Sequence, residues 1–253
     1  MGLIQRLIKS FLGFLLILAL SGFIMTNALY HATSQDFFMD QFKSLIGNQE
    51  DFNNNLASIH ENINIIFSTT DESETSININ EKDFTITREE AELSDEEFKD
   101  LVLDKLLSGM YDANLKELGF DTDMSMRDLN NQIYSYMRLS VILAIIVVIA
   151  AFVLLTGRLV FLGINLLIVG ISYYPMKWSV AKSIDVSLSQ LSGKEAEIMR
   201  PFITAIIDKI LSLSSAWYLY FFIAGAVLVG LGILFKVMGW GLWFQSFFEK
   251  KKK

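Results

Sequence analysis

The sequence has no cysteine, and its 253 residues include only two histidines and two prolines. The absence of cysteine excludes disulfide bonds, thiolate metal sites and cysteine nucleophiles. Charged residues are also scarce, at 19% against roughly a quarter in average globular proteins. Hydrophobic residues make up 52%, and the mean hydropathy is +0.41. This composition argues against an ordinary soluble domain and predicts a membrane protein.

Catalytic and nucleotide-binding motifs are missing as well. The sequence contains no Gly-x-Ser-x-Gly, no phosphate-binding glycine loop and no His-Glu-x-x-His. The two histidines, His31 and His60, each lack a second ligand three or four residues further on, which is a poor pattern for a metal site. We expect both histidines to face solvent, and we expect neither an enzyme activity nor a cofactor.

Four stretches without a charged residue are apolar enough to cross a lipid bilayer, namely residues 11–29, 139–155, 159–174 and 216–235. A spanning helix needs about 20 apolar residues to cross ~30 Å of hydrocarbon. Residues 139–174 would form a single helix of about 54 Å, so we predict a turn at Gly157 and Arg158. The first stretch exceeds the apolar region of about 7–15 residues that is typical of cleaved signal peptides. We therefore expect it to remain as a membrane span.

Charge is divided unevenly along the chain. Residues 33–137 contain 23 acidic and 7 basic residues, a net charge of −16, whereas the remainder contains 5 acidic and 14 basic residues. This asymmetry predicts one acidic, water-exposed domain attached to a basic membrane part. It also argues against nucleic-acid binding, because the acidic domain would repel phosphates.

Basic residues in the short segments predict the orientation in the membrane. With both termini in the cytoplasm, the cytoplasmic side holds eight basic residues against one acidic residue, Glu249. We therefore expect a multi-pass protein of the cell membrane whose acidic domain lies outside the cytoplasm. The side chains expected at the membrane interface are Arg6, Lys9, Arg158, Trp240, Trp243 and Lys250.

The expected fold class is mainly α: a four-helix polytopic membrane protein with a mostly helical extracytoplasmic domain that contains a small β-hairpin. The expected parts are a cytoplasmic N-terminus with the first span (1–29), the acidic domain (30–137), a membrane hairpin (138–174), a second extracytoplasmic segment (175–215), the fourth span (216–235) and an aromatic and basic tail (236–253).

Local patterns within the two outer segments predict their elements. Apolar residues at steps of 4, 3, 4 and 3 indicate an amphipathic helix, namely Phe52, Leu56, Ile59, Ile63 and Ile66. Alternation at Ile77 and Ile79, then at Phe84 and Ile86, predicts the hairpin. A capping box, Ser94 to Glu97, predicts the start of a further helix. Alternation over residues 178–188 indicates a strand, and residues 198–210 have helical spacing.

One stretch resembles the start of a calcium loop. Asp121, Asp123 and Asp128 supply oxygen ligands in quick succession, as hard cations require. The position that needs glycine is Met126, and the position that needs glutamate is Gln132. The competing interpretation is a capped helix start on an acidic surface, and these two departures favour it.

Within the predicted spans, no Asp, Glu, Lys, Arg or His is present, and Asn165 is the main strongly polar residue. Proton relays and ion pathways usually contain intramembrane charges. We expect Asn165 to form a hydrogen bond between helices, and we expect Ala226 and Gly230 to form a helix-packing face.

These observations favour a non-enzymatic envelope protein that presents its acidic domain for protein–protein interaction or envelope assembly. Its expected partners are membrane lipids and either a protein partner or further copies of itself. The alternatives are a subunit of an oligomeric channel or transporter, and a hydrolase acting at the outer surface.

Overall fold

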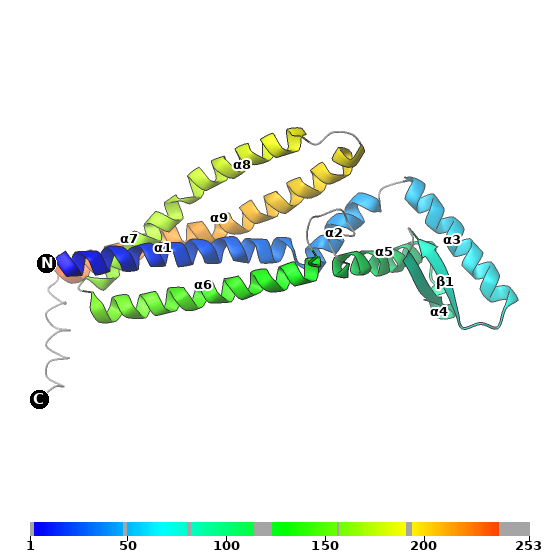
Figure 1. Cartoon of the computed structure of the whole chain (residues 1–253), viewed down its shortest axis with the longest axis horizontal. Coiled ribbons are helices and arrows are strands. Elements are labelled where there is room, and N and C mark those ends of the chain that lie inside the picture. The colour runs from blue at the N-terminus through cyan, green and yellow to red at the C-terminus, as the bar shows by residue number, and fades with distance from the viewer. Residues whose placement is uncertain are drawn as a thin grey trace, which may run out of the picture. The chain divides into compact units, whose positions relative to one another are not determined.

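A computed structural model describes residues 3–47, 50–79, 82–113, 123–155, 157–190 and 194–237 (Figure 1). The protein is mainly helical with one two-stranded hairpin, which confirms the predicted fold class at this level. The described elements are α1 (Leu3–Ala32), α2 (Gln35–Ile46), α3 (Glu50–Thr69), β1 (Glu74–Ile79), β2 (Lys82–Thr87), α4 (Arg88–Ala91), α5 (Asp95–Asp112), α6 (Met126–Leu154), α7 (Arg158–Ile171), α8 (Tyr173–Gln190) and α9 (Lys194–Val237).

The chain divides into two compact units. The membrane unit comprises Met1–Ala32, Asn131–Ala196 and Ile206–Lys253, and the acidic unit comprises Thr33–Asn130 with Glu197–Ala205. Among the residues that the structure describes, four helical segments are long and apolar enough to cross a membrane: Leu3–Ala32, Met126–Leu154, Arg158–Val180 and Ile203–Val237. The four predicted spans lie on these segments, so their number and approximate positions are confirmed.

The predicted turn between the second and third spans is present. Gly157 has a φ of +72°, a left-handed conformation that favours glycine because it has no Cβ. The Nε of Arg158 donates a hydrogen bond of 3.0 Å to the carbonyl oxygen of Leu155, one of the last carbonyls before the turn. Gly157 and Arg158 therefore end α6 and begin α7.

Glycines bring α7 and α9 into backbone contact within the membrane unit. An ideal Cβ added to Gly225 would lie 2.7 Å from the backbone nitrogen of Leu167 and 2.8 Å from the carbonyl oxygen of Gly163. Gly170 would likewise meet the backbone of Phe222 at 2.8 Å. These distances are shorter than real Cβ contacts, so the two helices approach each other at positions where only glycine fits without a shift.

This contact corrects the packing face predicted at Ala226 and Gly230. Both residues are exposed, and an ideal Cβ on Gly230 would meet nothing within 4 Å. The helix contact falls on Gly225, which is buried. Ala226 lies about 100° further around the helix than Gly225, which is enough to turn it away from α7.

Asn165 also differs from its predicted role. It is buried, but its Nδ2 donates a hydrogen bond of 2.7 Å to the carbonyl oxygen of Phe161, one turn earlier in the same helix. Its Oδ1 lies against α1, where an ideal Cβ on Gly13 would be only 2.9 Å away. Asn165 therefore satisfies its donor within α7 and packs closely on α1 at a glycine.

A second asparagine, which the sequence analysis did not select, connects three helices. The Oδ1 of Asn27 in α1 accepts a hydrogen bond of 3.0 Å from the Nε1 of Trp217 in α9. Its Nδ2 lies 3.5 Å from the Sδ of Met137 in α6. The Trp217 ring also makes an edge contact with Phe23, with 4.9 Å between ring centroids. Asn27 thus joins α1 to both α6 and α9.

The acidic unit has hydrophobic cores of its own. One cluster is formed by α3, the hairpin, α4 and α5, and a second by α2, α5 and the start of α6.

The predicted hairpin is confirmed, with Ile77 opposite Phe84 and Thr75 opposite Ile86. The predicted capping box is also confirmed, because the Ser94 hydroxyl accepts from the Glu97 amide while the Glu97 carboxylate accepts from the Ser94 amide.

The strand predicted over residues 178–188 is wrong, because this segment belongs to helix α8. A single strand leaves its backbone groups without partners, whereas a helix satisfies them internally. Pro175 stands at the third position of α8, within the first turn, where proline is tolerated.

The predicted helical spacing over 198–210 is confirmed, since α9 runs without interruption for 44 residues, or about 66 Å.

Candidate functional site

His60 lies in the core of the acidic unit, which corrects the prediction that it faces solvent. Only 4% of its surface is exposed. It stands on the buried face of α3 between Leu56 and Ile63, and Phe67 completes this face. The sequence analysis placed Ile66 in the apolar stripe of this helix, but Ile66 is 38% exposed and Phe67 is the buried residue. The buried positions step by 4, 3 and 4 residues, and His60 occupies one that an apolar residue would normally fill.

Three groups hold the His60 ring. Its Nδ1 lies 2.7 Å from Oδ1 of Asp95, and its Nε2 lies 2.9 Å from the carbonyl oxygen of Ala91. The ring stacks on Phe98, with 4.1 Å between centroids and 10° between planes. A carboxylate and a carbonyl oxygen both accept, so both contacts are hydrogen bonds when each ring nitrogen carries a proton. The ring therefore ties α3 to the start of α5.

This geometry does not assemble a Ser-His-Asp catalytic site. In such a site, one ring nitrogen faces the carboxylate and the other takes the proton of the serine hydroxyl. Here the second nitrogen is directed at the carbonyl oxygen of Ala91. The two nearby hydroxyls, Ser58 and Ser68, donate to the backbone carbonyls of Asn54 and Ile65 in their own helix. The contacts of the His60–Asp95 pair therefore serve the fold and do not form a catalytic site.

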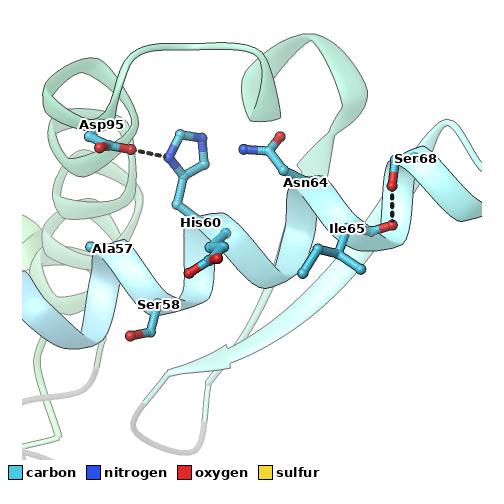
Figure 2. A pocket seen from close by; sticks show the side chains of 8 residues that line it. Ala57, Ser58, His60, Asn64, Ile65, Ser68 and Asp95 are labelled. Atoms are coloured by element: carbon cyan, nitrogen blue, oxygen red, sulfur yellow. Dashed lines mark hydrogen bonds and ion pairs between the residues drawn. The ribbon is translucent and has the colours of Figure 1, made fainter.

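Beside this pair, α3 and the start of α5 line a surface pocket of about 630 Å³ (Figure 2). We call it the α3 pocket, and its lining residues are Ala57, Ser58, His60, Glu61, Asn64, Ile65, Ser68 and Asp95. Figure 2 shows the Asp95 carboxylate reaching His60 from α5. Most of the lining comes from one helix, so the shape of the pocket depends on how α3 is fixed.

Arg88 fixes the C-terminal end of α3. Its guanidinium donates hydrogen bonds to the carbonyl oxygens of Phe67, Thr70 and Glu72, at 2.7, 2.7 and 3.0 Å. The last carbonyls of a helix have no partner within the helix, and a cation there is also favoured by the helix dipole. Arg88 follows the hairpin directly, so it attaches β2 and α4 to the end of the pocket helix.

An ion pair in the same unit joins α4 to α5. Oε2 of Glu90 lies 2.8 Å from Nζ of Lys105 and also accepts from the Thr87 amide. Burial raises the pKa of Glu90, but the hydrogen bond from Lys105, the Thr87 amide and the Lys105 charge together lower it below 4.5. The pKa of exposed Glu97 is also lowered, chiefly by hydrogen bonds from Ser94.

The depressed pKa of Glu90 predicts a loss of stability in acid. The ion pair stabilises the folded state fully above pH 4.5, and this contribution disappears as the pH falls through the lower folded-state pKa. We expect hydrogen exchange in residues 82–105 of the full chain to accelerate on acidification. Glu90→Gln should reduce that acceleration, and Glu89→Gln, one position earlier and exposed, should leave it unchanged. Equal acid sensitivity in Glu90→Gln and the wild type would contradict this role.

The calcium candidates do not form a common site in the described residues. Asp121 lies outside the described residues. Oδ2 of Asp128 accepts from the Ser125 hydroxyl at 2.8 Å and from the Ser125 amide at 3.2 Å, while the Asp128 amide donates back to the Ser125 hydroxyl. Asp128 therefore caps α6, as the competing interpretation proposed. No group of three or more metal-ligating side chains occurs among the described residues.

The side chains expected at the membrane interface fall into two groups. Trp240, Trp243 and Lys250 lie outside the described residues. Arg6, Lys9 and Arg158 are described, and Lys9 lies over the Phe161 ring at 5.8 Å from its centroid. This contact brings the N-terminal parts of α1 and α7 together, so the three basic residues lie at one end of the membrane unit. His31 is exposed near the end of α1, as predicted.

Comparison with known protein families, curated proteins and solved structures finds no match to this chain.

Proposed function

We propose that this protein is a component of the cell membrane that presents its acidic unit outside the cytoplasm to a protein partner, and that it acts by binding or assembly rather than by catalysis. The observation that carries the proposal is a compact unit of net charge −16, with two hydrophobic clusters of its own, attached to spans whose central stretches carry no Asp, Glu, Lys or Arg. Such a unit suits recognition, because a strong field of one sign steers and selects partners.

The proposed orientation has both termini in the cytoplasm. It is supported by the basic residues Arg6, Lys9 and Arg158, which the Lys9–Phe161 contact places at one end of the membrane unit. Basic residues in short segments favour the cytoplasmic side. In sequence, the acidic unit follows the C-terminal end of α1 and leads into the N-terminal end of α6, whereas Lys9 lies near the N-terminal end of α1 and Arg158 begins α7.

Two contacts bear on the alternatives. A channel formed between copies would need polar side chains at the contact, but Asn165 is only 6% exposed and is packed against α1. For an outer-surface hydrolase, both nitrogens of His60 already face acceptors, so His60 does not supply a free base.

Surface labelling of intact cells tests the orientation. The natural chain has no cysteine, so Glu74→Cys and Lys253→Cys each introduce a single thiol. We expect a membrane-impermeant maleimide to label the Glu74→Cys variant on intact cells, and the Lys253→Cys variant only after permeabilisation. Labelling in the reverse pattern would overturn the proposed orientation.

A second experiment tests the role itself. Photo-crosslinkers placed at exposed positions of the acidic unit should capture a defined protein in cells. Purified protein in liposomes should give no solute or ion flux above empty liposomes. Reproducible flux without a crosslinked partner would overturn the proposal in favour of a channel or transporter.

A further inference from the structure

The α3 pocket combines an exposed aliphatic side chain with a carboxylate. Ile65 is 55% exposed, and it and Ile66 are the exposed large hydrophobic residues of the acidic unit among those the structure describes. Glu61 lies one helical turn before Ile65, so the two side chains are neighbours on the outward face of α3. Both line the pocket. Within the described part of the chain, no ion pair involves the Glu61 carboxylate.

The net charge of the acidic unit indicates which class of ligand the α3 pocket would bind. At −16, the acidic unit repels anionic lipid, and it repels the acidic unit of a second copy. It attracts cations over the Debye length of about 8 Å at physiological ionic strength. A lysine or arginine carries an aliphatic stem that packs on apolar surface and a charged head that pairs with a carboxylate. That is the combination Ile65 and Glu61 offer.

The pocket wall is fixed before any ligand arrives. Both ring nitrogens of His60 face acceptors and its ring stacks on Phe98, while Arg88 donates to the Phe67 carbonyl oxygen in the last turn of α3 and to the carbonyl oxygens of Thr70 and Glu72 just after it. Preorganisation reduces the entropic cost of binding. Asp95 already uses Oδ1 to hold His60, which leaves Glu61 as the carboxylate of the lining without a role in the fold.

We propose that the α3 pocket binds a basic segment of the partner protein, with one lysine or arginine stem on Ile65 and its charge against Glu61. This inference rests on the proposed function and specifies the chemistry of the partner.

The test uses the full chain in nanodiscs of zwitterionic lipid, so that the lipid itself does not attract the probe. The probe is a fluorescent, end-blocked peptide of alternating lysine and leucine, and fluorescence anisotropy measures its Kd at physiological ionic strength. We expect Glu61→Gln to weaken binding about three- to fivefold, as for a solvent-exposed ion pair. Ile65→Ser should weaken it by a similar factor through lost apolar contact.

Matched controls separate the pocket from general attraction. Asp100→Asn removes an exposed carboxylate from α5 outside the pocket, and Ile66→Ser removes the neighbouring exposed isoleucine. Both should change the Kd by less than about twofold. A peptide with glutamine in place of lysine should not bind. Equal weakening by Asp100→Asn and Glu61→Gln would overturn the proposed binding at the α3 pocket, because net charge alone would then explain it. The absence of any binding by the lysine peptide would also overturn it.

The two proposals fail in different ways. A crosslinked partner in cells together with unchanged binding in Glu61→Gln and Ile65→Ser would overturn the α3 pocket and leave the proposed function standing. Flux without a partner would overturn the proposed function itself.

Discussion

Replacing Gly225 by alanine is expected to destabilise the membrane unit, whereas the same change at Gly230 is not expected to destabilise it. The added methyl of Gly225→Ala would lie 2.7 Å from the backbone nitrogen of Leu167. A backbone atom cannot rotate away as a side chain can, so α7 and α9 would have to separate. Overpacking of this kind costs about 1–3 kcal/mol, and a larger residue at the same position should cost more.

Gly230 provides a control in the same helix. It is exposed, and its added methyl would meet no atom within 4 Å. Both substitutions gain the same helix propensity, but only Gly225→Ala introduces a clash with α7. Thermal unfolding in nanodiscs, followed by circular dichroism, should give a lower Tm for Gly225→Ala than for Gly230→Ala. If Gly230→Ala proved the more destabilising change, α9 would pack on α7 through a different face.

The glycine contact also shows where sequence reasoning reached its limit. Gly163 and Gly170 on α7 are seven residues apart, as are Gly225 and Gly232 on α9. An interval of seven residues, two helical turns, returns to nearly the same face, so the pattern was visible in the sequence. The prediction instead used the four-residue spacing of Ala226 and Gly230, which is common in apolar helices and does not identify the partner helix.

The local elements could be predicted because their causes are local. The hairpin follows from alternation around residues 80–83, and the start of α5 follows from the Ser94–Glu97 capping box. The position of the helix at 173–190 could not be predicted in this way, because alternation predicts a strand only where a neighbouring strand completes the hydrogen bonds.

The environment of His60 depends on residues distant in sequence. Asp95 is 35 residues away and Ala91 is 31 residues away, and neither position stands out in an acidic sequence. One signal was available: His60 interrupts the apolar run of Leu56, Ile63 and Phe67 at the spacing of a buried position. A polar residue in register with an apolar stripe should be tested first for a buried hydrogen-bonded role.

Replacing Phe98 by alanine is expected to unfold much of the acidic unit. Phe98 is 1% exposed and belongs to the cluster that joins α3, the hairpin, α4 and α5. Truncating a buried phenylalanine to alanine costs about 3–5 kcal/mol, a large part of the 5–15 kcal/mol that is typical of a whole domain. The change also removes the stacking surface of His60. Glu96→Ala, two positions earlier and exposed, is the control.

The measurement is hydrogen exchange followed by mass spectrometry on the full chain in nanodiscs. Phe98→Ala should accelerate exchange in α3, the hairpin and α5, while the spans of α1 and α7 keep their protection. The reason is that each hydrophobic cluster of the described residues lies within one unit: two in the acidic unit and two in the membrane unit. Faster exchange in the spans as well would show that the acidic unit does not fold separately, which would remove the observation that carries the proposed function.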